Sequence, residues 1–123
     1  MSMLKDLVLV GLGGAVGSML RYAVTLLGRC VSAHAAVATL LCNLAGCFLI
    51  GLLIGCTTKG MNADLRLLLV GGFCGGFTTF STFSAEVLAW IERGEVWNAI
   101  AYSGISVVLG VALTFVGLRL SVN

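Results

Sequence analysis

The chain has 123 residues, of which 59% are hydrophobic and only 10% are charged, with a mean hydropathy of +1.11 and a net charge of +2. This composition is typical of an integral membrane protein, and the few basic residues form no stripe that would bind nucleic acid. We therefore predict one all-α transmembrane domain over residues 1–123, built from helices at about 4–27, 32–57, 65–90 and 96–119.

The first predicted helix contains one charged residue, Arg21, within an otherwise apolar run. The run spans the hydrocarbon core only if Arg21 lies inside it or at its edge. Snorkelling of this side chain to the membrane surface is the favoured interpretation. A signal peptide is the alternative, because Lys5 precedes an apolar run, but Asp6 offsets that charge and Arg21 would interrupt the apolar region.

The second predicted helix has no charged residue, and Asn43 lies near its middle. An amide at this depth is costly unless it faces protein or water. Two interpretations stay open for Asn43: a hydrogen bond to another helix, or a functional contact in a polar pathway.

The third predicted helix contains GGFCGGFTTFSTFS at residues 71–84, which combines four glycines with five hydroxyl side chains. This stretch predicts a helix broken at mid-membrane, with backbone carbonyl oxygens released from the helical ladder. Such oxygens need a partner inside the membrane. A hard cation would satisfy them, and a glycine-rich packing kink without an ion is the alternative.

The fourth predicted helix presents small and polar residues along one face. They recur at spacings of three or four, with Tyr102 extending the face at one end: Ser103, Ser106, Gly110, Thr114 and Gly117. Taken alone, this face indicates a packing seam. Opposite Asn43, Phe80 and Phe83 it would line a narrow wet path.

Carboxylates are scarce in the predicted spans. No Asp or Glu occurs between Asp6 and Asp64, and Glu86 is expected near the end of the third span. The interior therefore offers hydroxyl and amide donors rather than negative charge. Such donors suit an anion, and the positive edge of an aromatic ring attracts one as well.

Two further patterns concern packing. The five cysteines have no paired CxxC spacing, so we expect no disulfide framework and no zinc site, but small buried apolar side chains. Four pairs of glycines are spaced four apart, which predicts close helix contacts: 13 and 17, 51 and 55, 71 and 75, and 72 and 76.

Four spans place both termini on one side of the membrane. Lys5, Lys59, Arg66 and Arg119 then lie on that side, against Arg29 and Arg93 on the other, with Arg21 as a third if it reaches that surface. So weak a bias permits insertion in both orientations. Two oppositely oriented copies could then pair about a twofold axis in the membrane plane.

Three motifs resemble those of the Fluc family of small fluoride channels (CrcB-like): GLGGAVGSMLRY at 11–22, CNLAGCFLIG at 42–51 and GGFCGGFTTFSTFSAE at 71–86. The resemblance covers nearly the whole chain. It implies a dual-topology antiparallel homodimer with two pores that passes fluoride selectively and passively out of microbial cells. It further implies a structural sodium ion at the dimer centre, a place in the cell membrane (the inner membrane in bacteria) and a role in fluoride resistance.

The resemblance also implies roles for individual residues. Phe80 and Phe83 would turn their ring edges to fluoride, with Asn43 donating nearby. The backbone carbonyls of Gly75 and Thr78 would bind sodium. The remaining polar lining would comprise Ser81, Thr82, Tyr102, Ser106 and Thr114, with Arg21 near a vestibule. Gly110 departs from such a lining, because a hydroxyl would suit its position.

The sequence is compatible with two other functions, and neither is enzymatic. A small proton-coupled multidrug exporter is also short and four-spanning, but it needs a first-helix carboxylate, which the stretch between Asp6 and Asp64 does not offer. A non-conducting membrane subunit would use its polar groups only to lock helices together. The expected partners are therefore fluoride, sodium, membrane lipid and a second copy of the chain, with no nucleic acid.

Overall fold

The computed structural model describes residues 2–123 as helices joined by short connections, with no strand in that range. The helices are α1 (Ser2–Cys30), α2 (Ala35–Thr58), α3 (Ala63–Arg66), the π-helix η1 (Leu67–Cys74), α4 (Gly75–Phe77), α5 (Phe80–Glu92) and α6 (Val96–Val122). Four stretches are long and apolar enough to cross a membrane: Met3–Cys30, Ala35–Thr58, Ala63–Glu92 and Val96–Val122. The chain is thus an all-α, multi-pass membrane protein, as predicted. The second span begins three residues later than the predicted 32–57.

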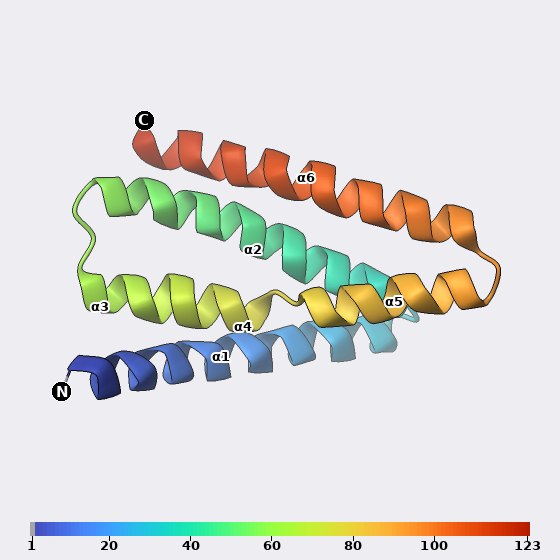
Figure 1. The fold of residues 1–123 in the computed structure, drawn as a ribbon, viewed down its shortest axis with the longest axis horizontal. Helices are drawn as coiled ribbons and strands as arrows, with labels where there is room; N and C mark the ends of the chain where they lie inside the picture. Colours follow the sequence, from blue (N-terminus) through green and yellow to red (C-terminus); the bar gives the residue numbers. More distant parts are fainter. Residues whose placement is uncertain (1) are drawn as a thin grey trace.

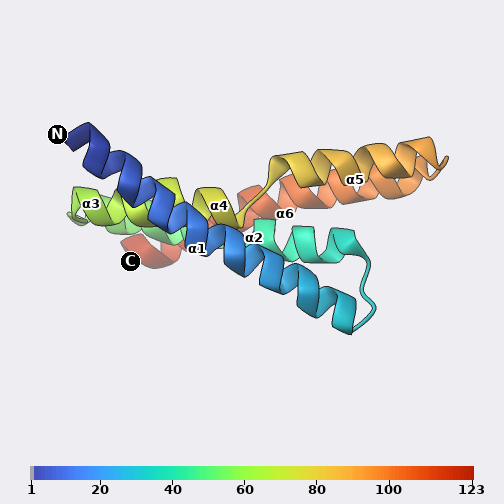
Figure 2. The ribbon, with the colours of Figure 1, turned by 90° about the horizontal axis from the view of Figure 1, so that it is seen from below.

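The four spans run up and down, so that both termini lie at the same end as the connection between α2 and α3 (Figure 1). The connections from α1 to α2 and from α5 to α6 lie at the opposite end. The most extensive helix contact joins α2 to α6, and α1 packs mainly along η1 and α4. Seen from below, α1 and α5 diverge, and α5 runs beside α6 (Figure 2).

Glycines allow these close helix contacts. A Cβ on Gly117 would lie 2.9 Å from the backbone nitrogen of Leu52, and a Cβ on Gly72 would lie 2.8 Å from the carbonyl oxygen of Val10. Neither contact leaves room for a side chain, because the neighbour in each case is backbone. The predicted pairs 13/17 and 72/76 and Gly51 lie at such backbone contacts, and Gly55 lies against the Ser121 side chain, whereas Gly71 and Gly75 are at no close contact.

The third span is broken at two threonines. Thr78 (φ −93°, ψ 156°) and Thr79 (φ −150°, ψ 121°) adopt extended backbone between α4 and α5. The Thr79 hydroxyl caps α5 by accepting from the Thr82 backbone N–H at 3.2 Å. The predicted interruption is therefore confirmed, and it redirects α5 away from α1 (Figure 2).

Candidate functional site

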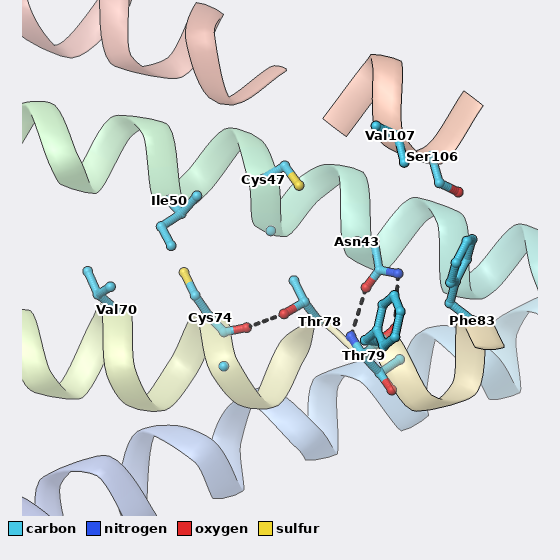
Figure 3. Close-up of a pocket in the computed structure, with 13 residues that line it drawn as sticks. Asn43, Cys47, Ile50, Val70, Cys74, Thr78, Thr79, Phe83, Ser106 and Val107 are labelled. Carbon is cyan, nitrogen blue, oxygen red and sulfur yellow. Dashed lines mark hydrogen bonds between the residues drawn. The ribbon is translucent and has the colours of Figure 1, made fainter. Parts of the chain in front are cut away.

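Asn43 of α2 bridges the break in the third span. Its Nδ2 donates to the Thr79 carbonyl oxygen at 3.1 Å, and its Oδ1 accepts from the Thr79 backbone N–H at 2.8 Å (Figure 3). In a continuous helix that N–H would serve the Gly75 carbonyl. The amide thus substitutes for helical hydrogen bonds at the break and keeps a second Nδ2 hydrogen for another acceptor. One of the two open interpretations of Asn43, a hydrogen bond to another span, is thus observed.

Arg21 of α1 supports the break from the other side. Its Nε donates to the Gly76 carbonyl oxygen at 3.0 Å, and the Ser18 hydroxyl lies 3.5 Å from the same oxygen. The prediction that Arg21 snorkels to the surface is therefore wrong. A released carbonyl at the C-terminal end of a half-helix, where the helix dipole is negative, instead ties the guanidinium to the middle of the third span.

We expect the Arg21→Met substitution to destabilise the protein, because it keeps an apolar stem but leaves the Gly76 carbonyl without its charged donor. The expected loss is about 1.5 to 3 kcal/mol, the usual contribution of a hydrogen bond to a charged group. Thermal unfolding in detergent measures it. Arg29→Met is the matched control, since Arg29 is exposed in the last turn of α1 and should tolerate the change.

Two other carbonyls at the break differ from those of Gly76 and Thr79. Among the described residues, no side-chain donor serves the carbonyl oxygens of Gly75 and Thr78. In a continuous helix the Thr79 N–H would donate to the Gly75 carbonyl, but here it donates to Asn43. The Thr82 N–H, four residues after Thr78, likewise donates to the Thr79 hydroxyl and not to the Thr78 carbonyl. These two oxygens can therefore serve as ligands for a hard cation.

A pocket of about 420 Å³ opens beside the break, between α2, α6 and the third span (Figure 3). Its lining brings together six of the predicted site residues: Asn43, Gly75, Thr78, Phe80, Phe83 and Ser106. Thr114 lines a second pocket, farther along α6. Ser81 and Thr82 lie at the start of α5, where their hydroxyls are 3.4 and 3.1 Å from the Thr79 hydroxyl.

Aromatic rings continue from this pocket toward the other end of α5. The ring centroids of Phe80 and Phe83 are 5.7 Å apart with a 36° tilt, and those of Phe83 and Tyr102 are 5.0 Å apart with a 41° tilt. Trp90 meets Tyr102 edge to face at 5.2 Å. Phe80 is 78% exposed, so its ring is available to a ligand or to another protein surface.

Glu86 contradicts the prediction that the interior offers hydroxyl and amide donors rather than negative charge. It lies six residues before the end of α5, and its carboxylate is held between three helices. Tyr102 Oη donates to Oε1 at 2.7 Å, and Thr39 Oγ1 donates to Oε2 at 2.8 Å. The interior of the bundle thus does contain a carboxylate, with two hydrogen bonds. Its spacing, three residues after Phe83, was the available signal, because that spacing puts both on one helical face.

A family model for CrcB-like protein, Camphor Resistance (CrcB), matches residues 8–118. The chain belongs to this family. A fluoride-specific ion channel FluC of Desulfotalea psychrophila is 44% identical over 123 residues, which cover 98% of this chain and 95% of that protein. Proteins of the same name from Azobacteroides pseudotrichonymphae and Francisella tularensis are 38% and 41% identical, over 94% and 90% of each chain. The resemblance to the Fluc family is thereby confirmed.

Proposed function

We propose that this CrcB-like chain forms a fluoride-selective channel that lets fluoride leave the cell passively. The names of relatives that match nearly the whole chain support this function. The observation that carries it is the meeting of the Asn43 amide with Phe80 and Phe83 at the helix break, in one pocket. An amide hydrogen and aromatic ring edges offer an anion partial positive charge, with no fully charged cationic side chain among the described residues of the pocket lining.

Glu86 fits this function despite its negative charge. Its two carboxylate oxygens accept from Tyr102 and Thr39, and it is not among the residues that line the pocket beside the break. The carboxylate nevertheless gives the proton-coupled exporter a specific candidate residue, so that alternative needs its own test.

Fluoride efflux from liposomes tests the proposed function. Vesicles that contain the purified protein are loaded with fluoride, and a fluoride electrode follows its release with no proton gradient imposed. We expect rapid release of fluoride and far slower release of chloride. Transport only under a proton gradient would favour the exporter, and no release of either anion would favour the non-conducting subunit.

We further propose that two copies assemble antiparallel and that each of two pores uses residues of both. Arg21 lies at the break and is therefore counted at neither end of the bundle. Four basic residues then lie at the end with the termini and two at the other, a bias weak enough to permit insertion in both orientations. The exposed Phe80 at the pocket also favours a second copy that completes the site. A tag is placed at one terminus, and a reagent that labels it is applied from each side of the membrane. We expect labelling from both sides. Labelling from one side alone would contradict dual topology.

We also propose that a structural sodium ion binds the Gly75 and Thr78 carbonyls of both copies. These are the carbonyls at the break that Arg21 and Asn43 leave without a side-chain donor. An experimental structure should show an atom about 2.4 Å from four such oxygens, as expected for oxygen around a hard cation. An atom with tetrahedral neighbours near about 2.8 Å would be water and would contradict the proposal.

A further inference from the structure

The second pocket, of about 510 Å³, adjoins the pocket at the helix break. The two pockets share three lining residues: Cys47 of α2 and Ser106 and Val107 of α6. Figure 3 shows these three side chains on the two helices that bound the first pocket on one side. Cys47, Ser106 and Val107 thus form the junction between the first pocket, which Asn43 lines, and the second pocket, which Thr114 lines.

The junction contains one polar atom with no protein partner. The Ser106 hydroxyl oxygen is buried and has no hydrogen bond within residues 2–123. Buried hydroxyls normally have a partner, so this one is available to a group that enters the pockets. Cys47 is half-buried beside it, and in Figure 3 its sulfur points toward the end of the pocket where Asn43 and Ser106 lie.

Gly110 explains why a thiol fits at this junction. A Cβ on Gly110 would lie 3.3 Å from the Cys47 sulfur, and no backbone atom is closer. This distinguishes Gly110 from Gly117, where the obstacle is backbone. The single O–H of Thr114 is shared between the carbonyl oxygens of Cys47 and Gly110, at 3.1 and 2.9 Å, and so links α2 to α6 beside these two residues. A side chain at residue 110 would therefore press against the Cys47 sulfur, which would have to shift by a few tenths of an ångström.

We propose that the Cys47 thiol is a further donor in the anion path and takes the place of the hydroxyl that is missing at Gly110. This inference rests on the proposed function. The S–H group is a weak donor, and it acts together with the Ser106 hydroxyl on an anion that passes between the two pockets. The pair Cys47 and Gly110 thereby tunes how readily fluoride crosses the junction.

Substitution separates the thiol's donor role from its packing. Cys47→Val fills similar space without a donor and should slow fluoride efflux about fivefold, the scale of one neutral hydrogen bond. Cys47→Ser, which keeps a donor, should conduct several times faster than Cys47→Val. Moving the donor across the junction, in the double variant Cys47→Ala with Gly110→Ser, should restore most of the flux that Cys47→Ala loses. Equal efflux in Cys47→Val and the parent would overturn the inference.

Silver ions provide a second test, because Ag⁺ replaces the thiol proton and forms an S–Ag bond that would obstruct the path. In chloride-free vesicles, Ag⁺ should stop fluoride efflux through the parent and through Cys42→Ser, the matched control, since Cys42 is only 1% exposed on the same helix. Cys47→Ser should resist the block. If Cys74→Ser resists instead, the other thiol at the first pocket faces the path and the inference is wrong.

A labelling experiment keeps this inference distinct from the proposed function. Iodoacetamide is applied to the folded parent in detergent, and mass spectrometry compares alkylation of Cys47 with that of Cys42. Alkylation of Cys47 but not of Cys42 supports a Cys47 thiol that faces water-filled space. This result would stand even if the parent releases no fluoride and the proposed function fails. Absence of alkylation at Cys47 would overturn the inference.

Discussion

Liposomes that contain the Asn43→Asp variant are expected to release fluoride at least about a hundredfold more slowly than those with the parent, because a carboxylate at an anion site costs several kcal/mol. Aspartate keeps the acceptor for the Thr79 N–H but loses the donor to the Thr79 carbonyl, from which its second oxygen is repelled. The free Nδ2 hydrogen that would serve fluoride is lost as well. The fluoride electrode assay measures this effect, with vesicles matched for protein content.

Asn43→Ala separates the anion contact from the bridge to the helix break. Alanine removes both bonds to Thr79, whereas aspartate keeps one. If Asn43 serves only the break, alanine should be at least as harmful as aspartate. If Asn43 donates to the anion, aspartate should be clearly worse, because it adds repulsion. Full flux through a correctly assembled Asn43→Asp protein would contradict any contact between Asn43 and fluoride.

The four spans and the break were predictable because their causes lie in local sequence. Charge-free stretches of sufficient length determine where the chain can cross a membrane, and they agree with the observed helices. The glycines and threonines of residues 71–84 weaken one helix at one place. The sequence left the exact break site open among several residues, since only the capping bonds of Thr79 select it.

Two polar contacts escaped prediction because their partners are distant in sequence. Arg21 lies 55 residues from the Gly76 carbonyl that it serves, and Glu86 lies 47 residues from Thr39. Position along a span indicates depth, but it does not reveal a released carbonyl or a pair of hydroxyls on a neighbouring helix. Arg21 was therefore predicted to snorkel and Glu86 to lie near the end of the third span, whereas the structure ties Arg21 to the helix break and Glu86 to two neighbouring helices.

The Phe80→Ile and Phe83→Ile variants are each expected to slow fluoride efflux about fivefold, because an edge contact of an aromatic ring is worth about 1 kcal/mol beyond burial. Isoleucine keeps bulk and apolar character but has no electropositive ring edge. Both rings line the pocket, with centroids 5.7 Å apart, so one anion in the pocket can contact both residues, and the double variant should lose roughly twenty-five-fold if the contacts add.

A matched pair of rings on the same span controls for packing. Phe73 and Phe77 stack at 5.6 Å before the break, and neither lines the two pockets beside it. Phe73→Ile should therefore leave the efflux rate unchanged, although it removes a comparable ring contact. The competing idea is that Phe80 and Phe83 merely fill an interface between two copies, because Phe80 is so exposed in the single chain. Such a plug would tolerate isoleucine. Contact between ring edges and fluoride would be ruled out if the Phe80→Ile and Phe83→Ile dimers remain intact in detergent and conduct like the parent.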